Sequence, residues 1–169
     1  MVVTLGLAKV GLVTNMGHEY AREVEVVDIG IPKEATDALH SGYHLITPDM
    51  FNSYFAPRRD DTHKGTYGHV LVIGGSSGKM GAGLLTGRGA LGSGAGLVTY
   101  ALPATAFVKF DIRSPEIMIE AIADGGRGYF TKSSLQGLKT AVEGKDVVAI
   151  GPGIGTQDET RSAFLDVVK

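Results

Sequence analysis

The chain has 169 residues, of which 25 are glycine and none is cysteine or tryptophan. Hydrophobic residues make up 43% and charged residues 20%, a balance typical of a folded globular protein. The formal net charge of −2 predicts no nucleic-acid partner, and the lack of cysteine excludes disulfides, thiolate metal sites and a cysteine nucleophile. No apolar run approaches the roughly 20 residues that span a bilayer, and the start lacks the pattern of a secretory signal. We therefore expect a cytoplasmic enzyme or binding domain with no membrane partner.

The first third of the chain predicts short elements. Residues 10–13 and 24–29 are rich in valine and predict two strands, separated by a polar turn at 15–18. Residues 33–46 show no clear period and are interpreted as a linker. Thr47 precedes Pro48, a pair that predicts a helix capped by the threonine side chain and ending near Tyr54.

From residue 69 the pattern is that of an α/β fold. Residues 69–73 form a continuous apolar run, typical of a strand buried on both faces, and a glycine-rich segment and a helical stretch to about Ser93 follow. This order is repeated and predicts a mostly parallel sheet flanked by helices. The further predicted elements are strands at 97–102 and 146–150 and helices at 104–110, 133–143 and 157–169.

Two glycine-rich segments carry the main functional signal. Residues 74–81 lie between a strand and a helix, where bare backbone N–H groups favour a phosphate or another anion. Residues 151–155, Gly-Pro-Gly-Ile-Gly, follow the strand at 146–150. Since the carboxyl ends of parallel strands share one edge, we expect both segments on a single rim, with amides of both gripping a ligand. Tight turns without a ligand are the alternative for each segment alone.

Other short motifs do not indicate a binding site, because the residues around them do not fit. Gly87, Gly89 and Gly92 match a dinucleotide-binding spacing, but they fall inside a predicted helix, where close packing on the sheet is the expected reason for them. Lys79 is followed by Met80 where a phosphate-binding P-loop needs serine or threonine, and Arg22 stands where a zinc motif beginning at His18 needs a second histidine.

The remaining histidines and charges suggest no site. His40 and His44 are interpreted as solvated, His63 and His69 as flanking a charged segment, and residues 58–61 as a solvated charge cluster. The sequence therefore predicts no catalytic residue and no metal ligand in this chain.

Four segments in order (61–76, 81–82, 93–99 and 149–155) resemble the ADP/ATP-dependent NAD(P)H-hydrate dehydratase family. Residues 1–32 resemble the carboxyl end of the NAD(P)H-hydrate epimerase domain that precedes the dehydratase in bifunctional members. The resemblance implies a ribokinase-like α/β fold that is incomplete here. It also implies an epimerase-like end at 1–32, a linker at 33–46 and the first part of the dehydratase domain at 47–169.

The resemblance further implies nicotinamide nucleotide repair, in which ADP or ATP with Mg²⁺ drives the dehydration of hydrated NAD(P)H. Gly81, Ala82 and Gly153 match positions near the hydrated dinucleotide, where they would give backbone hydrogen bonds and steric room. The catalytic aspartate of the dehydratase and the potassium site of the epimerase part have no counterpart, so we expect a partial copy that is inactive alone. An incomplete sheet also predicts self-association into a homo-oligomer. A small-molecule kinase of the same fold and a non-catalytic nucleotide-binding or oligomerisation module remain the alternatives.

Overall fold

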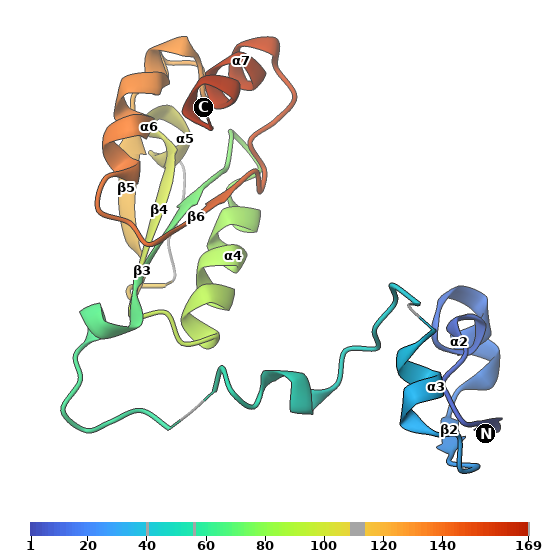
Figure 1. The fold of residues 1–169 in the computed structure, drawn as a ribbon. Coiled ribbons are helices and arrows are strands. Elements are labelled where there is room, and N and C mark those ends of the chain that lie inside the picture. Colours follow the sequence, from blue (N-terminus) through green and yellow to red (C-terminus); the bar gives the residue numbers. More distant parts are fainter. Residues whose placement is uncertain (40, 56, 109–113, 169) are drawn as a thin grey trace. The chain divides into compact units, whose positions relative to one another are not determined.

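The apolar runs of the second half of the chain form a four-stranded parallel sheet in the computed structural model (Figure 1). The structure describes residues 1–39, 41–55, 57–108 and 114–168. It divides into two compact units, Met1–Pro57 and Arg58–Lys169. Across the described ranges, no helix has the length and apolar character needed to cross a membrane.

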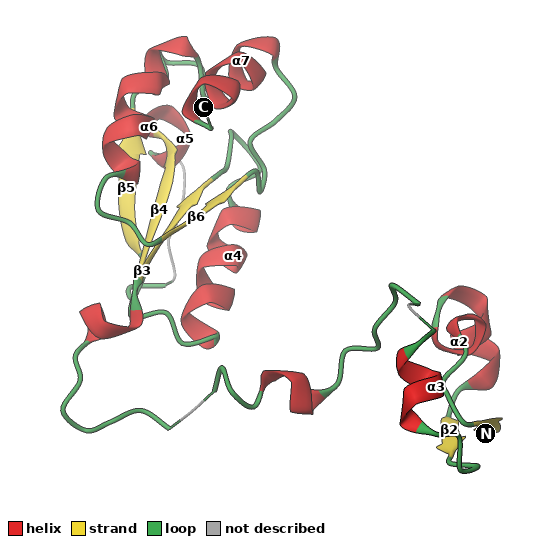
Figure 2. Cartoon of the chain, in the orientation of Figure 1, coloured by secondary structure: helices red, strands yellow, loops and turns green. Residues whose placement is uncertain are grey.

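The first unit is built on two short parallel strands, β1 (Val2–Leu5) and β2 (Val24–Val27), in which Val2 lies opposite Val24. Two helices connect them, α1 (Val10–Val13) and α2 (Asn15–Ala21). Helix α3 (Lys33–Asp37) follows, and a 3₁₀ turn, η1, covers Pro48–Phe51 (Figure 2).

Several predictions for this unit are wrong. Residues 10–13 and 15–18 are helical, because parallel neighbours such as β1 and β2 require a crossover of about a dozen residues and this segment supplies it. The strand predicted to reach residue 29 ends at Val27, and helix α3 lies within the segment interpreted as a linker. Thr47 precedes η1 in an extended conformation, but its side chain makes no capping bond and the turn ends at Phe51.

The second unit has the strand order β5-β4-β3-β6, and all of the pairs are parallel. The strands are β3 (His69–Ile73), β4 (Leu97–Pro103), β5 (Met118–Ile122) and β6 (Val147–Ile150). The helices are α4 (Gly81–Gly92), α5 (Ala104–Phe107), α6 (Leu135–Val142) and α7 (Asp158–Val167), with 3₁₀ turns η2 (Lys64–Tyr67) and η3 (Lys132–Ser134). Strand β5 was not predicted. Residues 109–110 of the helix expected at 104–110, and Lys169, lie outside the described residues.

Successive side chains of β3 and β4 alternate between two hydrophobic clusters, one on each face of the sheet. Leu71 and Ile73 pack with Phe130, Leu138 and Phe164, on the side of α6 and α7. The opposite cluster lies on the side of α4 and comprises Val72, Val98, Tyr100, Leu102 and Ile117, with Met80 and Leu84 packed against it. Figure 1 shows α4 on the opposite side of the sheet from α6 and α7. The predicted α/β fold with a helix-flanked parallel sheet is confirmed.

Close packing explains only some of the glycines of α4. A Cβ at Gly87 would lie 3.0 Å from Ile117 Cδ1 and 3.3 Å from Val98 Cγ1, so the predicted close packing is confirmed there. Gly89 and Gly92 face open space, and the same prediction is wrong for them.

Candidate functional site

The two glycine loops lie together at the carboxyl-terminal edge of the sheet, as predicted. We call residues 74–80, after β3, the first loop and residues 151–155, after β6, the second loop. The Gly75 N–H donates to Pro152 O at 2.8 Å, and the Ser76 hydroxyl donates to Gly153 O at 2.7 Å. Because β3 and β6 are adjacent and parallel, their ends deliver both loops to one rim.

A third segment, residues 124–128 after β5, joins the same rim. The Ser77 N–H donates to Gly128 O at 2.7 Å. The buried Asp124 carboxylate holds this segment, since it accepts from Gly128 N at 2.7 Å, Gly126 N at 3.1 Å and the Thr105 hydroxyl at 2.9 Å. The sequence analysis missed this segment, although an aspartate followed by Gly-Gly-Arg-Gly is a recognisable turn signal.

Several of the loop amides bond to protein. The N–H groups of Gly75 and Ser77 bond across loops, and those of Gly151 and Ile154 donate to Ile73 O and Gly151 O. Between them, these bonds join the loops to one another and to the sheet. The amides of these four residues are therefore structural.

The first turn of α4, which begins at Gly81, offers N–H donors that are not used in this way. Gly81 and Ala82 are exposed, and no side chain caps this helix. Among the described residues no carbonyl accepts their N–H groups. Uncapped N–H groups at a helix N-terminus carry partial positive charge and favour an anion.

Gly153, the third predicted site residue, lies beside this turn. It adopts φ +75°, and a Cβ there would overlap Lys79 O, two residues before Gly81. The structure therefore brings Gly81, Ala82 and Gly153 into one neighbourhood. The role it shows for Gly153 is close packing of the second loop on the first.

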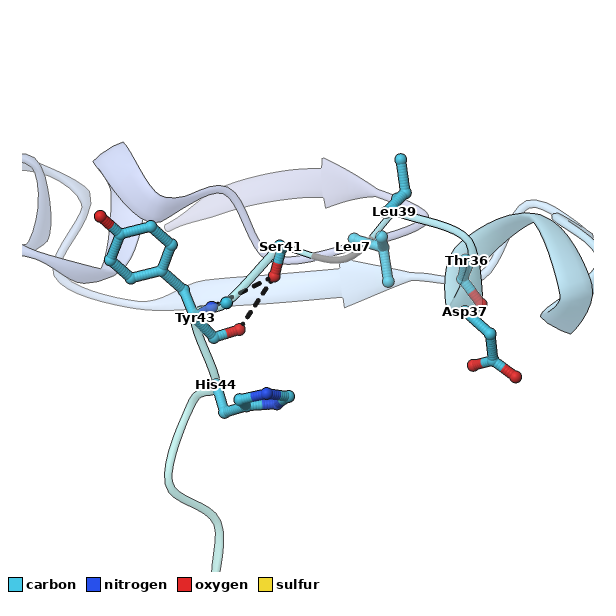
Figure 3. Close-up of a pocket in the computed structure, with 8 residues that line it drawn as sticks. Leu7, Thr36, Asp37, Leu39, Ser41, Tyr43 and His44 are labelled. Carbon is cyan, nitrogen blue, oxygen red and sulfur yellow. Dashed lines mark hydrogen bonds between the residues drawn. The ribbon is translucent and has the colours of Figure 1, made fainter.

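Two cavities have linings that do not include the uncapped turn. One of about 520 Å³ belongs to the first unit and is lined by residues including Leu7, Asp37, Tyr43 and His44 (Figure 3). Its carboxylate, Asp37, is paired with Lys33 at 2.6 Å. A groove of about 470 Å³ runs between residues 154–156 and α7, lined mainly by apolar side chains together with Arg161.

His69 lies away from the rim. His69 begins β3, at the opposite edge of the sheet, and its ring Nε2 lies 2.8 Å from the Thr99 hydroxyl. Burial lowers the pKa of His69, Lys145 lowers it further, and Asp146 opposes the shift. Among the described residues, no three histidine, aspartate or glutamate side chains converge to hold a metal ion. His40 lies outside those residues.

The charged segment before β3 is structural. The His63 ring accepts from Gly65 N at 3.1 Å and caps η2. Arg59 pairs with Asp61 at 2.8 Å, with both side chains mostly exposed, which confirms a solvated cluster. Arg58 stacks 4.0 Å from the centre of the Tyr67 ring.

Comparison with known proteins agrees with this architecture. The sequence model of the NAD(P)H-hydrate dehydratase family matches residues 70–169. The bifunctional NAD(P)H-hydrate repair enzyme Nnr of Moorella thermoacetica is 36% identical over 167 residues, 99% of this chain and 31% of that enzyme. The ADP-dependent (S)-NAD(P)H-hydrate dehydratase of Staphylococcus aureus is 38% identical over 120 residues, 70% of this chain and 40% of that enzyme.

Solved structures with a similar fold include a dehydratase. A hypothetical protein of Streptococcus mutans superimposes with a TM-score of 0.57 and 30% identity, over 73% of this chain and 41% of that one. The ADP/ATP-dependent NAD(P)H-hydrate dehydratase of Bacillus subtilis, co-crystallised with ATP/Mg²⁺, gives a TM-score of 0.50 and 28% identity over 66% and 37% of the two chains. The chain spans about a third of the length of the bifunctional relatives it matches. Because the family model covers more than half of its residues, the chain belongs to the NAD(P)H-hydrate dehydratase family.

Proposed function

We propose that the second unit binds hydrated NAD(P)H for nucleoside-phosphate-dependent dehydration, with the ligand's phosphates at the N–H groups of Gly81 and Ala82. The observation that carries this proposal is the uncapped first turn of α4, exposed where the first and second loops meet. The dehydratases among the relatives support the choice of ligand.

The chemistry assigned to this chain is binding and electrostatic positioning. In the proposed reaction, ADP or ATP phosphorylates the hydroxyl of the hydrated ring, and its proton goes to solvent. Phosphate then leaves as the ring nitrogen supplies electrons, and the resulting cation loses a proton from the neighbouring ring carbon to solvent, which restores the double bond. Backbone dipoles fixed before the ligand arrives stabilise its negative charge without reorganisation. Among the described residues no three histidine, aspartate or glutamate side chains converge, so we assign no metal-dependent step and no proton transfer to them.

We further propose that the chain self-associates and works in nicotinamide nucleotide repair in the cytoplasm. Strand β6 is the last of the sheet, and no strand in the described ranges pairs with its outer edge. Val147 is 55% exposed on it. Unpaired edges of this kind favour association.

A pair of matched variants tests the ligand site. Gly81→Ala and Gly89→Ala lie on the same helix, and at both positions an added Cβ has no neighbour within 4 Å. Calorimetric titration of the full chain with hydrated NADPH is expected to show about tenfold weaker binding for Gly81→Ala, because its methyl group crowds the ligand's approach to the amide. Gly89→Ala should bind as the wild type does.

Equal affinities in both variants would place the ligand elsewhere. Turnover is followed separately, as the return of reduced nicotinamide absorbance after ADP or ATP is added, and none is expected from this chain alone. Phosphorylation of an alcohol without elimination would instead favour a small-molecule kinase. ATP binding without any binding of the hydrated cofactor would favour a nucleotide-binding module.

A further inference from the structure

A tyrosine hydroxyl lies buried beneath the proposed ligand site. Tyr100 is in the middle of β4, is fully buried, and belongs to the cluster on the α4 side of the sheet. The other members of that cluster are aliphatic. A phenylalanine would fill the same volume, so the hydroxyl requires a separate reason.

The ring of Tyr100 occupies space that two glycines leave free. A Cβ at Gly75, in the first loop, would overlap the tyrosine hydroxyl, and a Cβ at Gly83, in the first turn of α4, would overlap the ring. Gly75 also adopts φ +80°, which favours glycine. Tyr100 thus sets how closely both the loop and the helix start approach the sheet.

The hydroxyl of Tyr100 donates to Met80 O at 2.9 Å. Met80 directly precedes α4, and the same carbonyl accepts the longer bond from Leu84 N, at 3.4 Å. Burial raises the pKa of Tyr100 to about 12, so the hydroxyl remains a donor at physiological pH.

One planar peptide connects this bond to the ligand site. Met80 C=O and Gly81 N–H belong to the same trans peptide group, in which the two bonds point in opposite directions. A carbonyl held toward the buried Tyr100 therefore directs the Gly81 N–H away from the core. Gly81 is exposed, and its N–H has no acceptor among the described residues.

We infer that Tyr100 is a positioning residue for the ligand site: its hydroxyl fixes the Met80–Gly81 peptide, and its ring fixes the first loop against α4. Together they aim the Gly81 N–H at an anionic group of the ligand. The inference rests on the proposed function, because it assumes that the ligand's phosphate binds there.

The test compares Tyr100→Phe with Thr160→Val in the full chain. Each variant deletes one buried hydroxyl that donates to a backbone carbonyl. The Thr160 hydroxyl donates to Phe130 O at 2.6 Å, and Thr160 lies 60 residues after Tyr100 in the chain. Both should lower the melting temperature by similar amounts. Only Tyr100→Phe should weaken hydrated NADPH, by about five- to twentyfold, and move the Gly81 amide resonance in ¹H–¹⁵N spectra of the ligand-free chain.

The outcomes separate the inference from the proposed function. A wild-type chain that does not bind hydrated NADPH overturns the proposed function, and the inference built on it falls too. If the wild type binds and Tyr100→Phe binds equally well, only the positioning role is overturned, even where the Gly81 resonance moves. Equal weakening by Thr160→Val would show a general loss of stability and would also overturn the role.

Discussion

Asp124 shows how one side chain can support a loop without touching the ligand site. Its carboxylate accepts hydrogen bonds from the backbone N–H groups of Gly126, Gly128 and Thr105 and from the Thr105 hydroxyl. Gly128 O in turn receives the Ser77 N–H of the first loop. The buried carboxylate therefore joins the end of β5, the start of α5 and the rim.

Asp124→Ala should lower the free energy of unfolding by about 3 kcal/mol, because it leaves several buried donors unpaired. Urea denaturation of the chain measures this loss. Asp158→Ala removes an exposed aspartate from the first turn of α7 and should cost no more than about 0.5 kcal/mol. Equal losses in the two variants would contradict the supporting role of Asp124.

The success of the sequence predictions also differs from residue to residue. The sequence could predict that three residues lie near one another, Gly81, Ala82 and Gly153, because parallel strands end at a shared edge whatever the intervening sequence. The turn at Asp124 is local and could have been predicted, but its bond to Thr105 and the bond of Tyr100 to Met80 could not, since these partners lie 19 and 20 residues away and only the packed sheet brings them into contact.

At the scale of the element, the sequence predicts the bounds of a strand best where the strand is buried on both faces. Strands β3 and β4 were predicted within one residue because they are mostly apolar and rich in residues that favour strands. Strand β5 was missed because Glu120 stands in the middle of its short apolar run. The valines of Val10–Val13 favour a strand locally, but the crossover between β1 and β2 outweighs that propensity.

The exposed edge of β6 should govern self-association of the chain. Val147→Lys should shift the chain toward monomer in light scattering coupled to gel filtration, because a lysine on an edge strand disfavours pairing with another chain. Leu85→Lys replaces a residue that is 68% exposed on α4 and should leave the mass unchanged. A wild-type chain that is monomeric at micromolar concentration would contradict the proposed self-association.

At the scale of the whole molecule, the two units differ in how much apolar surface they bury. Among the described residues of the first unit, Ala21 is the only buried hydrophobic side chain, whereas the second unit contains two clusters. A two-stranded sheet with so small a core is marginal in water. The second unit therefore holds most of the stability.

Hydrogen exchange followed by mass spectrometry should show this difference. Peptides covering β1 and β2 should exchange much faster than peptides covering β3 and β4, whose exchange should approach the rate set by global unfolding. Equal protection of both sets would contradict the assignment of the core to the second unit.

The hydrogen bonds that join residues 74–80, 124–128 and 151–155 have a consequence for the kinetics of recognition. Since these bonds exist before any ligand arrives, the rim is preorganised and little chain entropy remains to be lost on association. Encounter should then resemble the docking of two rigid bodies, so that affinity differences among ligands appear mainly in their dissociation rates.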